Sequence, residues 1–205
     1  KRILNEIKKF RQQENIKIYL SYGNDAVGGK KIFGFRLKKP NMQKRLFSSD
    51  LKGGAILDGG IYLVSFLVDI IYKIKNSSDF KIRLIFKNNK KLHNGVDVNS
   101  EIKLFIDDIY IHLKTSLEKK LENVLSIKSN NKSFIINDFI NIDNKTKLMF
   151  GRNTIKNTKH KNSSYFYQIQ SISNAIKNKK IYINEYKKLL KKKEMTYNIL
   201  DQWLK

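Results

Sequence analysis

The chain has 205 residues, a formal net charge of +24, one proline and no cysteine. The missing cysteine excludes disulfide bonds and thiolate chemistry, while a hydrophobic content of 40% is enough for one core. The charge favours a polyanionic partner, but the lysines are spread almost evenly along the sequence and only six of the basic residues are arginines, the usual readers of bases and phosphates.

The first forty residues predict a short helix, a strand, a turn and a second strand. Apolar residues recur at helical spacing within residues 1–14. Residues 16–22 alternate between apolar and polar side chains, and the turn-forming residues 24–29 follow them. Residues 31–38 alternate again until Pro40 ends the run, which predicts a further strand.

Residues 53–74 form the longest apolar run and carry four of the ten glycines. Paired glycines before a helical run indicate that the backbone passes close to another group, where a Cβ atom would not fit. We expect a buried helix that begins near Asp58. If Asp58 has a purely structural role, it caps this helix. Asp58 and Asp69 interrupt the run, whereas a membrane span needs about 20 apolar residues. The glycines lack GxGxxG spacing and follow no clear strand, so we exclude a nucleotide-binding loop.

Beyond residue 74, short apolar runs separated by Asn, Asp, Ser and Gly predict an antiparallel meander. The expected strands are residues 80–87, 101–106, 109–117, 124–128, 133–136 and 147–150. Residues 151–164 predict a polar loop, and residues 165–177 and 184–205 predict two helices.

Together these elements predict an α+β fold with an open, mainly antiparallel sheet of about six strands. One face of the sheet is expected to be covered by the helix of residues 58–74 and by the two C-terminal helices. The residues expected to point inward from the C-terminal helices are Ile169, Ile172 and Ile176 in the first, and Tyr186, Leu190, Tyr197, Leu200 and Leu204 in the second.

The three histidines do not predict a metal site. His93, His112 and His160 fall in a turn, a strand and a loop, with no metal-ligand spacing between them. We interpret His112 as a residue of the sheet surface rather than a catalytic group.

Asp58 and Tyr62 are four residues apart, so a helix places a carboxylate and a phenol on one face. Residues 45–62 read Arg-Leu-Phe-Ser-Ser-Asp-Leu-Lys-Gly-Gly-Ala-Ile-Leu-Asp-Gly-Gly-Ile-Tyr. This stretch resembles the motif that opens the long helix in the C-terminal, substrate-binding domain of the Gfo/Idh/MocA family oxidoreductases. The final tyrosine is most similar to the dimeric dihydrodiol dehydrogenase branch, and the resemblance covers most of residues 27–205.

The resemblance implies a C-terminal domain fold like those of dihydrodipicolinate reductase and glyceraldehyde-3-phosphate dehydrogenase. It makes Tyr62 the proton donor or acceptor at the reacting hydroxyl and Asp58 the group that orients the substrate. Arg45 either holds an anionic substrate group or pairs with Asp50. Tyr165 and Gln168 open a helix that borders the substrate cleft in the family, although simple packing would also explain them.

The same resemblance implies a partner domain that this chain lacks. Family members begin with a domain that binds NAD or NADP through a glycine-rich loop and carries a Glu-Lys-Pro motif, and neither feature occurs here. Residues 1–205 are then a single substrate-binding domain, and the cofactor is bound mainly upstream. On this alignment the family's turn and strand correspond to residues 27–40, and residues 1–22 are the last helix and strand of the preceding domain.

The function implied is the substrate half of an NAD(P)-dependent oxidoreductase that acts on a carbinol carbon of a sugar or polyol. The family further implies a cytoplasmic protein, association of copies through the open face of the sheet, and neither a specific nucleic-acid partner nor a membrane. Two alternatives stay open: a non-catalytic binding or dimerisation module with this fold, and a basic nucleic-acid-binding protein, as composition alone suggests.

Overall fold

The computed structural model describes residues 2–27, 31–32, 35–36, 44–77, 79–140, 147–151, 153–156 and 164–205. Its elements in chain order are α1 (Arg2–Lys8), β1 (Lys17–Gly23), β2 (Lys31–Ile32), β3 (Phe35–Arg36), the 3₁₀ turn η1 (Arg45–Phe47), the π-helical turn η2 (Ile56–Gly60), α2 (Ile61–Lys75), β4 (Ile82–Lys91), β5 (Asp97–Ile106), β6 (Ile109–Ser116), β7 (Leu121–Lys128), β8 (Ser133–Asn137), β9 (Lys147–Phe150), β10 (Asn153–Lys156), α3 (Ser164–Lys177) and α4 (Lys179–Leu204).

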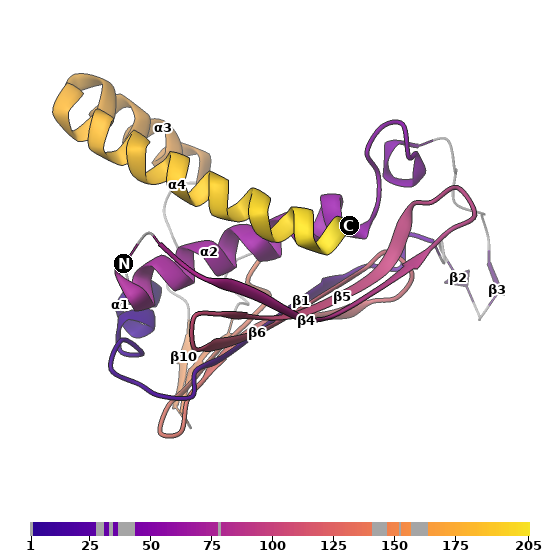
Figure 1. Ribbon diagram of the computed structural model, residues 1–205, viewed down its shortest axis with the longest axis horizontal. Helices are drawn as coiled ribbons and strands as arrows, with labels where there is room; N and C mark the ends of the chain where they lie inside the picture. The colour runs from indigo at the N-terminus through magenta and orange to yellow at the C-terminus, as the bar shows by residue number, and fades with distance from the viewer. Residues whose placement is uncertain are drawn as a thin grey trace.

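The main sheet has eight strands in the order β10-β9-β8-β7-β1-β6-β5-β4, and helices lie along one of its faces (Figure 1). Every neighbouring pair is antiparallel except β1 and β6, which run parallel. The predicted α+β fold with a mainly antiparallel sheet is therefore confirmed. The sheet is wider than expected because β1 joins it and because residues 153–156, which we expected in a loop, pair with β9 beyond a turn at Gly151, whose φ is +59°.

Strand β1 lies in the interior of the sheet, between β7 and β6. Its residues Ile18 and Leu20 are fully buried, and Ile7 and Phe10 from the preceding segment join the same core. The interpretation of residues 1–22 as the end of a preceding domain is therefore wrong. Of the strand expected at residues 31–38, the described residues form β2 and β3, which pair with each other in a separate two-stranded sheet. Residues 33–34 and 37–38 lie outside the described residues.

The core lies between the sheet and α2. Alternate residues of β5 and β6 face this helix and are fully buried, among them Leu104, Ile111 and Leu113. Leu63 and Leu67 of α2 are equally buried against them. Each such side chain contributes about 1.5–3 kcal/mol by leaving water, so α2 is held along its whole length.

The C-terminal helices cover less of the sheet than expected. Among the described side chains of α4, those that pack on the core lie toward its end: Met195, Ile199, Leu200 and Trp203. The first half of α4 and all of α3 extend beyond the sheet (Figure 1). Of the residues expected to point inward only Leu200 is buried, and the exposed ones are Ile169, Ile172, Ile176, Tyr186, Leu190, Tyr197 and Leu204. The prediction that these residues point inward was wrong, because helical periodicity identifies an apolar face but not what covers it.

The open face of the sheet carries charged and aromatic side chains. The half-buried His112 lies there, as predicted, with its Nε2 atom 2.8 Å from Glu101 Oε1 and its ring edge-on to Tyr19. Burial lowers the pKa of His112 even though Glu101 opposes this shift. Burial alone would raise the pKa of Glu101, but His112 and Lys114 together hold it below its ordinary value.

Candidate functional site

The start of the long helix is squeezed between three other segments. The helix begins at Ala55, three residues earlier than predicted, and passes through the π-helical turn η2 into α2. A Cβ atom on Gly53 would overlap the backbone oxygen of Arg45, and one on Gly54 would overlap the carboxylate of Asp97. Gly54 also has φ of +122°, which L side chains rarely adopt. The paired glycines are needed because η1 and β5 both touch the backbone here.

Asp97, from β5, caps this helix across the fold. Its Oδ2 atom accepts hydrogen bonds from the Ile56 backbone N–H at 2.8 Å and from Ser100 Oγ at 3.1 Å. Burial raises the pKa of the Asp97 carboxyl above its ordinary value, and the hydrogen bonds from Ile56 and Ser100 oppose that rise. The sequence analysis missed Asp97 because its partner lies 41 residues away, beyond the reach of any capping motif.

Asp58 is therefore free of the capping role that we considered for it. It lies within η2, and its backbone N–H bonds to the Gly54 carbonyl oxygen. Its carboxylate forms a salt bridge with Arg45, with Arg45 Nη2 lying 3.0 Å from Asp58 Oδ1. Arg45 thus pairs with Asp58 rather than with Asp50.

Tyr62 lies one turn after Asp58 and its side chain is 54% exposed. Phe66, four residues further on, packs edge-on against Phe139, with ring centroids 5.1 Å apart. Residues at four-residue spacing share one side of a helix, so Asp58, Tyr62 and Phe66 lie on the side of α2 that faces the end of β8. A π-helical turn at this point is notable because such turns occur frequently at functional sites.

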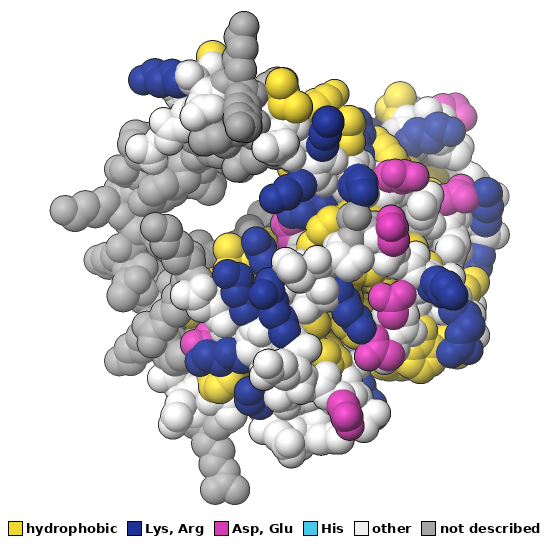
Figure 2. Space-filling view, turned by 60° about the vertical axis from the view of Figure 1, so that its left-hand side comes forward, with side chains coloured by type: hydrophobic (Ala, Val, Ile, Leu, Met, Phe, Trp, Pro, Cys, Tyr) yellow, Lys and Arg dark blue, Asp and Glu magenta, His cyan; other side chains and the backbone are white. Residues whose placement is uncertain are grey.

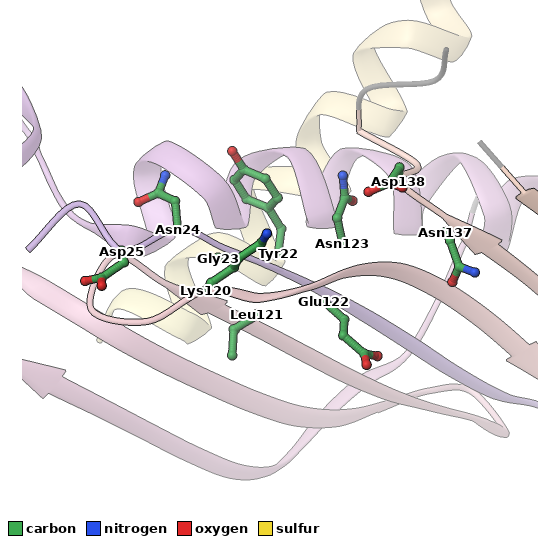
Figure 3. A pocket seen from close by; sticks show the side chains of 10 residues that line it. All are labelled: Tyr22, Gly23, Asn24, Asp25, Lys120, Leu121, Glu122, Asn123, Asn137 and Asp138. Carbon is green, nitrogen blue, oxygen red and sulfur yellow. The ribbon is translucent and has the colours of Figure 1, made fainter. Parts of the chain in front are cut away.

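A cavity of about 570 Å³ lies at the ends of β1, β7 and β8 (Figure 3). Most of the residues that line it are of polar type: Tyr22, Gly23, Asn24, Asp25, Lys120, Leu121, Glu122, Asn123, Asn137 and Asp138. The side chains of Tyr22, Asn24 and Asn123 point to the same side, toward α2, whereas Glu122 and Asn137 point away from it.

This cavity borders the start of the long helix. A ring carbon of Tyr22 lies only 3.1 Å from where a Cβ atom of Gly59 would be, so Tyr22 touches the residue next to Asp58. Asn24 Oδ1 is buried and has no hydrogen-bond partner among the residues that the structure describes. A buried amide oxygen without a partner is suited to accepting a hydrogen bond from a hydroxyl group. Sequence reasoning missed Tyr22 and Asn24, whose only signal was their position at the end of a strand.

The structure does not test the two other predicted site residues. Tyr165 and Gln168 belong to α3, but their side chains lie outside the described residues, as does His160. Within the described ranges, no group of His, Cys, Asp or Glu side chains could hold a metal ion. None of the helices in those ranges is long and apolar enough to cross a bilayer.

A nicotinamide dinucleotide does not fit the start of the long helix. A helix N-terminus can bind phosphate through its free N–H groups, but here the Asp97 carboxylate already occupies the Ile56 N–H. A phosphate next to this carboxylate would meet like charge. The glycine pair that precedes the helix is thus a packing feature and not a phosphate loop.

The sequence matches no known protein-family model and no curated protein. Solved structures share the fold. A mutant form of KijD10, a 3-ketoreductase from Actinomadura kijaniata in complex with TDP-benzene and NADP, has a TM-score of 0.63 at 11% identity, covering 98% of this chain and 55% of its own. The dehydrogenase MviM from Clostridium difficile has a TM-score of 0.54 at 12% identity, with coverages of 98% and 59%. Aldose-aldose oxidoreductase from Caulobacter crescentus, complexed with glycerol, has a TM-score of 0.56 at 9% identity, with coverages of 85% and 50%.

These similarities establish a shared fold. The chain spans little more than half the length of the solved proteins it matches. The activities of those proteins therefore enter below only as a proposal.

Proposed function

We propose that this chain is the substrate-binding half of an NAD(P)-dependent oxidoreductase that acts on a carbinol carbon of a sugar or polyol in the cytoplasm. The observation that carries the proposal is the exposed Tyr62 phenol one turn after the Arg45–Asp58 salt bridge, on a helix whose start touches Tyr22 of the cavity. The oxidoreductases that share the fold, and the NADP and glycerol bound to two of them, support it.

In this proposal each group of the site has a separate task. Tyr62 donates a proton to the reacting oxygen or accepts one from it, which a phenol can do as general acid or base. Asp58 accepts a hydrogen bond from the substrate, and Arg45 keeps its carboxylate in position. Tyr22, Asn24 and Asn123 bind the remaining hydroxyl groups in the cavity.

We expect the nicotinamide cofactor to be bound by residues outside the described ranges, because the start of the long helix cannot bind its phosphates. The resembled family supplies a dinucleotide-binding domain, together with the lysine of its Glu-Lys-Pro motif. We therefore assign no step of hydride transfer to this chain. Titration of the 205-residue chain with NADH or NADPH should show no binding tighter than about millimolar, which is worth roughly −4 kcal/mol.

Ligand binding tests the substrate half of the proposal without a cofactor. NMR or calorimetric titration of the chain with a panel of sugars and polyols should identify a saturable ligand. Asp58→Asn should weaken this binding, while Asp50→Asn, a similar change on the neighbouring loop, should not. If no sugar or polyol binds, or if both variants bind as the parent chain does, the assignment of Asp58 fails.

A second candidate is a binding module of the same fold without catalysis. The capped start of the long helix, which offers no site for a dinucleotide phosphate there, favours it. The product of the complete gene separates the two candidates when it is assayed with NAD(P) and the identified ligand. Turnover supports the oxidoreductase, whereas ligand binding without turnover supports the module.

A further inference from the structure

Helix α4 has a second apolar face that does not touch the core. Ile183, Leu190, Tyr197 and Leu204 recur at seven-residue intervals and are 51%, 46%, 57% and 38% exposed. Residues seven apart lie almost in line along a helix, as in the seams of coiled coils. We call these four residues the α4 seam.

The seam lies on the outer side of α4. Met195, Ile199 and Trp203 bind the helix to the core and are all buried. At 100° per residue these three point roughly opposite to Leu190 and Tyr197. The first half of α4 also projects beyond the sheet (Figure 1), so the sheet does not cover the seam there.

Charged residues flank the seam in a directional order. Positions 180, 187, 194 and 201 also recur every seven residues, and the sequence places Lys, Lys, Glu and Asp there. The flank is thus basic in the first half of α4 and acidic in the second half. In an antiparallel pair this flank faces the same flank of the partner, which places Lys187 beside Glu194 of the other copy.

The apolar seam has the same symmetry. When two α4 helices run antiparallel and cross at Leu190, Leu190 meets its own copy and Ile183 meets the partner's Tyr197. The same register brings Lys187 to the partner's Glu194, because the midpoint between positions 187 and 194 nearly coincides with Leu190. A contact in which the same patch of both copies matches itself is the isologous arrangement of twofold dimers.

We propose that two copies of the chain associate through the α4 seam as an antiparallel helix pair whose twofold axis passes near Leu190. In this dimer the projecting first half of one α4 lies over the second half of the partner's α4, on the side that faces away from the partner's core. This surface is separate from the open face of the sheet, and the inference does not depend on the proposed enzymatic function.

Charge exchange tests the register. Sedimentation velocity at tens of micromolar should show a dimer, which Lys187→Glu and Glu194→Lys should each weaken about tenfold or more, by some 1.4 kcal/mol. The double variant should restore the dimer because each Lys then faces a Glu again. Lys188→Glu is the matched control, since it makes the same charge change at an exposed position away from the seam. Circular dichroism should show unchanged helix content in all variants.

Cysteine crosslinking tests the direction, because the chain has no cysteine of its own. Leu190→Cys should form an intermolecular disulfide under mild oxidation. Ile183→Cys should not, since antiparallel helices separate the two copies of this position by roughly 20 Å. The proposal would be overturned by a strict monomer or by an efficient Ile183→Cys crosslink. It would also be overturned by a dimer that neither charge variant weakens, and that result would point to the open sheet face instead.

Discussion

Two carboxylates at the start of the long helix have different environments. Asp97 is buried, accepts a backbone N–H and caps the helix. Asp58 reaches solvent and pairs with Arg45, and its neighbour Tyr62 is more than half exposed. Since Asp97 performs the structural task, Asp58 and Tyr62 are available for chemistry.

Tyr62→Phe separates the catalytic interpretation from a packing one. The substitution removes the hydroxyl group but keeps the ring, and the side chain is more than half exposed. In the complete oxidoreductase that we propose, kcat should fall roughly 10²–10⁴-fold, the usual contribution of general acid–base catalysis. Thermal unfolding should barely change. Intact turnover would show that Tyr62 is only a surface residue.

Asp97 predicts a pH dependence of stability. Burial raises the pKa of its carboxyl above the ordinary 3.8, so the folded chain keeps this proton to a higher pH than the unfolded chain does. The contribution of this shift to the free energy of unfolding is therefore full below pH 3.8 and is lost as the pH rises through the folded-state pKa.

Asparagine does not ionise, so Asp97→Asn tests this dependence directly. The stability of the parent chain relative to Asp97→Asn should decrease from acidic to neutral pH. Urea unfolding of both proteins at a series of pH values measures that difference. A difference that stays constant across the series would mean that the pKa of Asp97 does not change on folding.

At the scale of elements, the long helix is fixed by contacts that come from distant parts of the chain. The η1 turn, β5 and β1 each touch its first residues, through Arg45, Asp97 and Tyr22. This crowding explains why the glycines cluster there and why the site lies at the junction of three elements.

Gly54→Ala measures this crowding. The new Cβ atom would overlap the Asp97 carboxylate and would also strain a backbone with φ of +122°. We expect a loss of about 2 kcal/mol or more in the free energy of unfolding. Gly95→Ala is the control, because Gly95 also has positive φ, +82°, but nothing lies within 4 Å of its Cβ position. Its cost should be only the backbone term of about 1–2 kcal/mol, and equal losses would show that the Asp97 contact is soft.

Local patterns predicted the elements better than their partners. The helix after the glycines and most of the strands could be found because periodicity and turn residues act over a few positions. The cap by Asp97, the place of β1 beside β6, and the cavity at Tyr22 all depend on residues far apart in the sequence. The outward apolar face of α4 was predicted to be a core face, because apolar residues recur at the same helical spacing whether the face is exposed or buried.

At the scale of the whole molecule, two surfaces compete for association of copies. The prediction that the open sheet face binds another chain stays a prediction, and its aromatic pair Phe105 and Tyr110 lies among charged residues such as Glu101 and Lys114. The α4 seam is apolar along its centre and charged at its flank. If both surfaces bind, two different twofold contacts lead either to a closed tetramer or to an open filament.

The net charge of +24 predicts how the chain binds nucleic acids. Figure 2 shows basic side chains scattered over the described part of one face, with acidic and apolar groups between them rather than a continuous basic stripe. Such a surface attracts any polyanion through counterion release, which weakens steeply as salt increases. Mobility-shift assays should therefore find binding to duplex DNA, single-stranded RNA and heparin alike at low salt, and little retention near physiological salt. Tight binding that distinguishes one nucleic-acid sequence from another at physiological salt would instead establish a built recognition site, and would move the nucleic-acid alternative ahead of the oxidoreductase.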